Sequence, residues 1–195
     1  SLKSIKSRIN ALSGGQDIAN LFHPKYDELL QVLRKRTFKG PWSEGPAGAK
    51  IKIKEEFKDA WLPIETALGK TLETVFVTTV EDQRMVSNLM RSKGMLTSVT
   101  KIPAPKPGAP ARYRGEKITG ATTVADCITC DDDLVFNGLC EQANILRSLV
   151  IANEDDYKHF TDASGNFLRG VTAAFDAFGT KVEIRNGNKQ NTSVL

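Results

Sequence analysis

The hydrophobic positions of this chain follow two periods, which predict helices that alternate with strands. Spacings of three and four residues predict helices, and strict alternation or runs of β-branched residues predict strands. The predicted helices cover 23–36, 55–69, 81–93, 131–143 and 154–163. The predicted strands cover 49–54, 71–78, 96–102, 145–152, 170–175 and 181–187. Because both halves of the chain alternate in this way, we expect an α/β or mixed α+β fold in two lobes.

Two segments fall outside this alternation and set the expected boundaries. Residues 1–13 show the spacing of a coiled-coil seam or of a plain amphipathic helix, carried by Leu2, Ile5, Ile9 and Leu12. The proline- and glycine-rich stretch 103–117 cannot hold regular structure and predicts an exposed connection. The expected organisation is the end of a coiled-coil arm at 1–20, a first lobe at 21–102, the connection at 103–120 and a second lobe at 121–195.

Gly69-Lys70-Thr71 has the ending of a phosphate-binding loop, but its spacing and context differ from one. Such a loop needs a glycine five residues before Gly69, and Ile64 stands there. The loop also joins a strand to a following helix, whereas here a predicted helix precedes the glycine and a predicted strand follows it. We therefore interpret Gly69 as the residue that ends a helix.

Composition and charge narrow the class of protein without deciding its function. The 195 residues are 40% hydrophobic and 26% charged, which is ordinary for a globular protein, and no apolar run could span a bilayer. The net charge of +4 is compatible with nucleic-acid binding but does not demonstrate it. Cys127 and Cys130 form a C-x-x-C pair, which invites a zinc or redox interpretation. A zinc site needs about four ligands, however, and only Cys140 remains, since the two histidines do not stand at ligand spacing. We therefore expect structural thiols, no metal and no cofactor. The chain also has no G-x-S-x-G, H-E-x-x-H or G-x-G-x-x-G motif, so an enzyme is not the leading interpretation.

The order of elements resembles the hinge domain of structural-maintenance-of-chromosomes (SMC) proteins. The first half shows a helix, "GPAGAKIKI", a helix that ends in "IETALG", a strand, and a "T-x-E-D" turn that opens the next helix. The second half shows "CITCDDDLVFNGLCEQANILRSLVIAN" and the closing hairpin "AAFDAFGTKVEIRNG". Within the family, the pattern is most similar to the six-type subunit of the SMC five–six complex. The proline-rich stretch 103–110 departs from the family pattern.

The resemblance implies a dimerisation module rather than an enzyme. SMC hinges have two lobes and join in pairs, lobe one to lobe two, and the family's ATPase site lies in a head domain outside the hinge. The implied partner is the paralogous five-type hinge, and the implied ligand is single-stranded DNA, with double-stranded DNA as a further candidate. The implied setting is DNA repair and recombination on chromosomes in the nucleus, with no membrane. The apolar run "ILRSLVIA" suits an interface, and the expected interface residues are Ile145, Leu146, Leu149 and Ile151.

The expected DNA contacts follow from charge rather than from the family. Between residues 34 and 54 the chain has seven basic residues against one acid, with Phe38 and Trp42 among them. Cations that contact phosphates and a ring that stacks on a base suit single-stranded DNA, but a solvated basic face with Trp42 in the core explains the same pattern. In a strand over 49–54, Lys50, Lys52 and Lys54 would share one face at about 6.6 Å spacing. The candidate contacts are Arg34, Arg36, Lys39, Trp42, Lys50, Lys52, Lys54, Arg112, Arg114, Lys181 and Arg185.

Three functional hypotheses therefore stay open. The first is a dimerisation hinge that also binds DNA, and the second is a dimerisation module whose basic residues serve only solubility. The third is a small α/β enzyme with a nucleotide site. Added ATP should raise thermal stability only if the third hypothesis holds.

Overall fold

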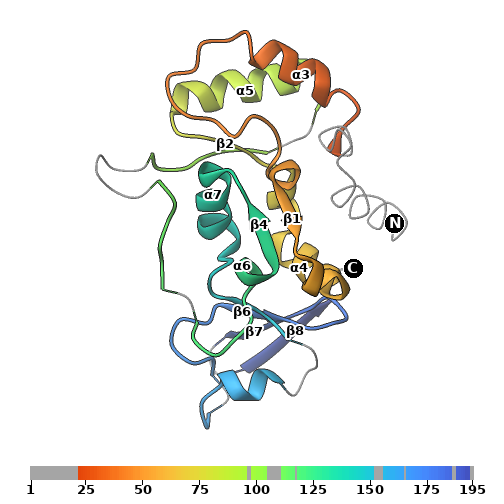
Figure 1. Cartoon of the computed structure of the whole chain (residues 1–195), viewed down its shortest axis with the longest axis vertical. Coiled ribbons are helices and arrows are strands. Elements are labelled where there is room, and N and C mark those ends of the chain that lie inside the picture. Colours follow the sequence, from red (N-terminus) through yellow and green to blue (C-terminus); the bar gives the residue numbers. More distant parts are fainter. Residues whose placement is uncertain are drawn as a thin grey trace. The chain divides into compact units, whose positions relative to one another are not determined.

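In a computed structural model the chain forms two compact units, and each unit is built from three separate segments (Figure 1). The residues that the structure describes are 22–95, 98–104, 111–116, 118–151, 156–164, 166–185 and 188–193. Unit 1 comprises Ser1–Lys52, Lys70–Arg114 and Cys130–Gln142. Unit 2 comprises Ile53–Gly69, Gly115–Thr129 and Ala143–Leu195. The units thus differ from the contiguous lobes that we expected, because 53–69 belongs to unit 2 and 130–142 to unit 1.

Unit 1 is organised around β2 (Val75–Val77), which is buried along its whole length. On one side β2 pairs in parallel with β3 (Val99–Lys101), with Val75 opposite Val99. On its other side the segment 42–47 donates backbone hydrogen bonds, from Ser43 N to Phe76 O and from Ala47 N to Thr74 O, each 2.9 Å long. A strand flanked on both sides and buried on both faces explains the continuous apolar run that predicted it.

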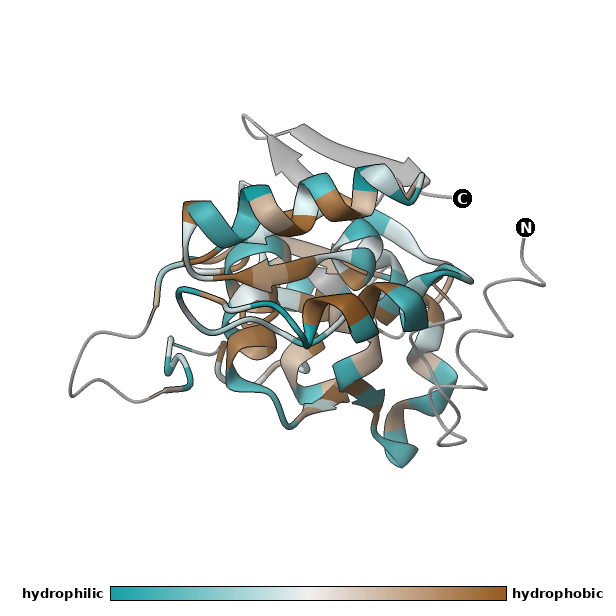
Figure 2. Cartoon of the chain, turned by 90° about the horizontal axis from the view of Figure 1, so that it is seen from above, coloured by the Kyte–Doolittle hydropathy of each residue, from teal (hydrophilic) through white to brown (hydrophobic). Residues whose placement is uncertain are grey.

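The helices α3 (Tyr26–Leu33) and α5 (Val80–Ser92) contact each other and supply much of the unit 1 core. Both are amphipathic, and Figure 2 shows apolar and polar residues alternating along the helices. α5 begins at Thr79, whose hydroxyl accepts a hydrogen bond from Asp82 N, and its C-terminal end is followed by Gly94 at φ +71°. The buried core residues are Tyr26, Leu29, Leu30, Leu33, Val75, Val77, Val86, Met90 and Met95.

The helix α7 (Asp133–Ala143) packs against β2 through a glycine. A Cβ atom at Gly138 would stand 2.5 Å from ring atoms of Phe76, which is fully buried. Only a glycine therefore allows the ring to lie against the helix.

Unit 2 contains a sheet in the order β5-β6-β7-β8, formed by Ser148–Val150, Ala173–Phe175, Thr180–Arg185 and Asn188–Ser193. β5 and β6 are parallel, and the remaining pairs are antiparallel. The helix α4 (Trp61–Leu68) packs against β5, β6 and β7. Gly179, at φ +74°, turns β6 into β7 next to Leu62 and Thr66 of α4. The core between these elements includes Leu149, Ile151, Ala174 and Val182.

The short elements complete the two units. α6 (Val124–Cys127) begins at Thr123, whose side chain and backbone both bond Asp126. β1 (Ile51–Ile53) and β4 (Ile128–Cys130) each cross the boundary between the units along the chain. The 3₁₀ helices are η1 (Ala47–Lys50), η2 (Glu55–Ala60), η3 (Gly69–Glu73) and η4 (Asp156–Phe160).

Most predicted elements are confirmed, but several predictions were wrong in detail. The strand expected over 49–54 is only three residues long, because η1 occupies its first half. The helix expected over 55–69 is split into η2 and α4, and Pro63 lies in the first turn of α4, where it needs no hydrogen-bonded N–H. The helix expected over 154–163 is only the 3₁₀ helix η4 among the described residues. The elements α6, β4 and β8 were missed altogether. The expected coiled-coil segment 1–20 lies outside the described residues.

Candidate functional sites

The segment 34–42, which we call the basic loop, carries exposed cations at the end of α3 in unit 1. It leaves the helix through backbone hydrogen bonds from Arg34 N to Leu30 O and from Arg36 N to Leu33 O, each 2.9 Å long. Among the described residues no carboxylate lies within ion-pair distance of its cations. The exposed basic residues of the loop are Arg34, Lys35, Arg36 and Lys39.

A buried carboxylate fixes the backbone of the basic loop. Asp82 is only 2% exposed and accepts hydrogen bonds from Lys39 N at 3.0 and 3.1 Å and from Gly40 N at 3.0 Å. The hydroxyl of Thr79 also donates to Asp82, at 2.7 Å. A Cβ at Gly40 would come within 2.2 Å of the Thr78 hydroxyl oxygen, so the close approach requires glycine. Asp82 therefore fixes the backbone of the basic loop, while the cationic side chains of the loop stay exposed to solvent.

The two aromatic residues of the basic loop form a parallel stack. The ring centroids of Phe38 and Trp42 lie 4.5 Å apart and their planes differ by 2°. Both rings are half-buried and pack against the unit 1 core, and Trp42 forms an isolated bridge with Val77. The structure thus gives Trp42 a packing role and leaves part of the stack at the surface.

The lysines expected on one strand face do not share a regular strand. Lys50 ends η1, Lys52 is the central residue of β1, and Lys54 precedes η2. Lys52 is exposed, whereas the other two are half-buried. Lys54 N donates to Cys127 O at 2.9 Å within unit 2. The regular 6.6 Å spacing that a strand over 49–54 would give was therefore a wrong expectation.

Residues 111–114, which we call the strap, are fixed on α7 of unit 1. The Arg112 guanidinium lies 2.8 Å from Asp133 Oδ1, donates to Cys130 O, and stands 4.6 Å above the centre of the Phe136 ring. Asn137 holds the neighbouring backbone, since it accepts from Tyr113 N at 2.6 Å and donates to Ala111 O at 2.8 Å. The strap therefore uses Arg112 internally, and it leaves Tyr113 and Arg114 exposed.

The remaining candidate cations lie in unit 2. Lys181 is half-buried on β7, opposite Phe175. The backbone of Arg185 pairs with Asn188, but its side chain lies outside the described residues.

The apolar residues expected at a dimer interface are part of the unit 2 interior. Ile145 and Leu149 are fully buried and Ile151 is 4% exposed, while Leu146 is half-buried. Both edges of β5 are also occupied, by β6 and by a hydrogen bond from Val150 N to Thr122 O at 2.9 Å. The structure thus gives these side chains a role in the protomer's own core. The sheets end instead at β3 in unit 1 and at β8 in unit 2, among the residues described.

The three cysteines are free thiols, of which Cys127 and Cys130 are buried and Cys140 is half-buried. Burial is the largest cause that raises the pKa of Cys127 to about 12 and that of Cys140 to about 12, and it also raises the pKa of Cys130. Within the described part of the chain, no group of three or more His, Cys, Asp or Glu residues could hold a metal ion. A buried thiol with a raised pKa is a poor nucleophile and a poor ligand at neutral pH.

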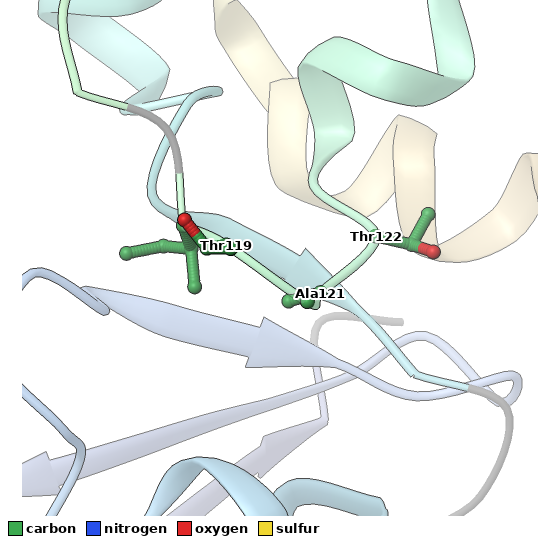
Figure 3. A pocket seen from close by; sticks show the side chains of 5 residues that line it. Thr119, Ala121 and Thr122 are labelled. Atoms are coloured by element: carbon green, nitrogen blue, oxygen red, sulfur yellow. The ribbon is translucent and has the colours of Figure 1, made fainter.

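Two further features, Gly69-Lys70-Thr71 and a pocket in unit 2, lack the geometry or the charged side chains of a ligand-binding site. Gly69 ends α4 at φ +46° and is followed by η3, so Gly69-Lys70-Thr71 does not join a strand to a helix. A shallow pocket of about 500 Å³ in unit 2 is lined by residues 118–122, in the loop that leads into α6 (Figure 3). It contains no charged side chain. No helix in the described ranges is long and apolar enough to cross a membrane.

Comparison with known proteins identifies the family. The SMC proteins Flexible Hinge Domain family matches residues 42–154, which is more than half of the chain. This chain belongs to the SMC hinge family. The hinge domains of SMC proteins are dimerisation modules of chromosome-associated complexes, and they are not catalytic. A comparison with curated proteins found no match.

Solved hinge structures share this fold. The S. pombe Smc5/6 hinge domain has a TM-score of 0.68 at 21% identity, over 98% of this hinge and 72% of that chain. The Pyrococcus furiosus SMC protein hinge domain has a TM-score of 0.56 at 17% identity, over 98% of this hinge and 86% of that chain. The folded elbow of cohesin has a TM-score of 0.55 at 16% identity, over 99% of this hinge and 26% of that chain. At these identities the likeness establishes the fold.

Proposed function

We propose that this hinge is the six-type subunit of an SMC five–six complex and pairs with the paralogous five-type hinge. The order of motifs in the sequence supports this assignment, and so does the similarity of fold to the S. pombe Smc5/6 hinge domain. On this proposal the protein acts in DNA repair and recombination on chromosomes in the nucleus.

Pairing would use surfaces that the protomer leaves open. The sheet edges at β3 and β8 can each accept a further strand, because the outer edge of a sheet presents unpaired backbone groups. Phe178, at the turn between β6 and β7, is 78% exposed. Asp176 fixes this turn by accepting from Phe178 N and Thr180 N at 2.9 and 2.8 Å. An apolar side chain on a rigid turn is a suitable anchor for a protein interface.

Light scattering tests the pairing proposal. Equimolar mixing with a five-type hinge should give a one-to-one complex, and Phe178→Ser should weaken that complex without changing the fold. Leu168→Ser, which removes another exposed apolar side chain of unit 2, serves as the matched control. Separate elution of the two hinges at micromolar concentration would reject the heterodimer.

We further propose that the hinge binds DNA through the basic loop and prefers single strands. The observation that carries this proposal is the set of four exposed, unpaired cations on a loop whose backbone Asp82 fixes. Such cations can contact consecutive phosphates, and a loop that is already ordered loses little entropy on binding. The alternative, that the hinge only dimerises, leaves these cations as solvated surface.

A salt titration distinguishes these alternatives. Binding of a single-stranded oligonucleotide should weaken as salt rises, with a log–log slope of about −0.7 for each phosphate contact and about −2 for three contacts. Equal and negligible binding of single- and double-stranded oligonucleotides at low salt would favour a pure dimerisation module. Added ATP should leave the thermal midpoint unchanged, and an ATP-dependent rise would instead support a nucleotide site.

A further inference from the structure

We propose that the Phe38–Trp42 stack is a base-stacking site that lets the hinge distinguish unpaired bases from duplex DNA. The inference rests on the proposed DNA binding by the basic loop and names the part of that loop responsible for strand preference. It predicts two separable contributions to binding. The cations bind phosphates of any nucleic acid, whereas the rings bind only bases that are free to stack.

The geometry of the pair is suited to this role. The two planes are parallel within 2° at a centroid distance of 4.5 Å, so a planar base can extend the stack in the same orientation. Both side chains are half-buried, with part of each at the surface. Both rings pack against the core of unit 1, and the β-bridge between Trp42 and Val77 fixes the backbone of the tryptophan.

The surroundings of the stack favour a nucleic acid over an apolar partner. Lys39 lies between the two aromatic residues in sequence, and its side chain is exposed. Because Asp82 binds the backbone N–H of Lys39, this side chain extends from a fixed backbone position. Arg34, Lys35 and Arg36 precede the stack and are exposed, and Glu44 is the one acid within 34–54. A rigid aromatic pair among unpaired cations matches a strand that presents phosphates and unstacked bases together.

Duplex DNA cannot use the stack in the same way. Its bases are already paired and stacked on each other, so they are not free to meet a protein ring without being extruded. The phosphates of a duplex still reach the cations. The rings should therefore change the ratio of single- to double-strand affinity, and the cations should change both affinities.

The fluorescence of Trp42 provides the first test. The chain has two tryptophans, so Trp61→Phe leaves Trp42 as the reporter. An oligothymidine should quench this fluorescence, while an abasic oligonucleotide of equal length, which keeps the phosphates, should bind without comparable quenching. Equal quenching by both would overturn the stacking site.

Ring deletions provide the second test. Phe38→Leu and Trp42→Leu should each lower the affinity for oligothymidine about tenfold and leave duplex and abasic binding within about twofold. Trp42→Phe keeps a ring in the stack and should retain the preference, which separates stacking from a failure to fold. An unchanged strand preference in both leucine variants would overturn the inference, as would a loss confined to pairing with the five-type hinge. Absence of any binding by the parent would instead reject the proposed DNA binding itself.

Discussion

The basic loop and the strap are both held in unit 1 by one charged side chain, but with opposite consequences. In the basic loop the anchor is an acid, Asp82, that binds backbone N–H groups of Lys39 and Gly40. The cations of that loop are then left without partners. In the strap the anchor is the cation itself, because Arg112 is shared among Asp133, a backbone carbonyl and an aromatic ring.

The difference shows why counting basic residues does not locate a polyanion site. Arg112 and Arg34 look alike in a list of charges, yet only Arg34 keeps its whole charge available to a phosphate. Desolvation and existing partners decide that availability, since the ion pair with Asp133 already offsets much of the charge of Arg112 and occupies part of its donors. Arg112 therefore serves to hold the strap on α7. The basic loop is the surface to test first for contacts with DNA.

The largest expected effect concerns the anchor of the basic loop. Asp82→Ala removes the charge-assisted hydrogen bonds from Lys39 N, Gly40 N and the Thr79 hydroxyl, which are partly buried, so it should lower the free energy of unfolding by about 3 kcal/mol. Glu81→Ala, an exposed acid one position earlier in α5, should change it by less than about 0.5 kcal/mol. Urea denaturation measures both. Equal, small losses would show that Asp82 does not hold the loop.

A second prediction compares two sets of cations at equal change of charge. Replacing Arg34, Arg36 and Lys39 together by Glu should weaken single-strand binding more than tenfold, because three contacts are lost and repulsion is added. The same change at Lys50, Lys52 and Lys54 should cost less, since these lysines do not form a regular strand face. Fluorescence anisotropy at fixed salt measures both triple variants. Equal weakening would mean that affinity follows net charge and that the basic loop is not a distinct site.

The sequence predicts the elements of this fold better than their grouping. Periodicity found α3, α5 and α7, because that signal is local. The assignment of 53–69 to unit 2 depends on contacts between distant segments, which no local pattern records. β8 has no apolar alternation, and its one signal was the hairpin dipeptide Asn186-Gly187 before it.

The candidate sites were predictable only in part for the same reason. The excess of charge in 34–54 and the nearby aromatic residues were visible in the sequence. The partners of those residues were not, since Asp82 lies some forty positions away from the loop that it holds and Asn137 lies 24 positions from Tyr113. The apolar run 145–151 suits an interface or a core equally in the sequence, and only the structure shows that Ile145, Leu149 and Ile151 are buried in unit 2.

A third prediction concerns the anchor of the strap. Arg112→Ala should lower the free energy of unfolding by about 1–2 kcal/mol, from a half-exposed ion pair, a backbone hydrogen bond and the contact with Phe136. Part of that loss should disappear at high salt, because salt screens the ion pair. Arg114→Ala, which removes an exposed neighbour, is the matched control and should be neutral. Strap stability that is insensitive to Arg112, measured by urea denaturation and by amide exchange at Tyr113, would contradict the comparison.

The smallest expected effect uses a thiol beside the strap. Burial raises the pKa of Cys140 to about 12, against a partial lowering by Arg112. A thiol whose pKa is raised on folding stabilises the protein fully below the unfolded value of about 9, and that contribution is lost as pH rises toward 12. Between pH 8 and pH 10 the parent should therefore lose about 1 kcal/mol more stability than Cys140→Ala, because only the parent has this thiol to ionise on unfolding. If the free energy of unfolding changed equally with pH in the two proteins, folding would not raise the pKa of Cys140.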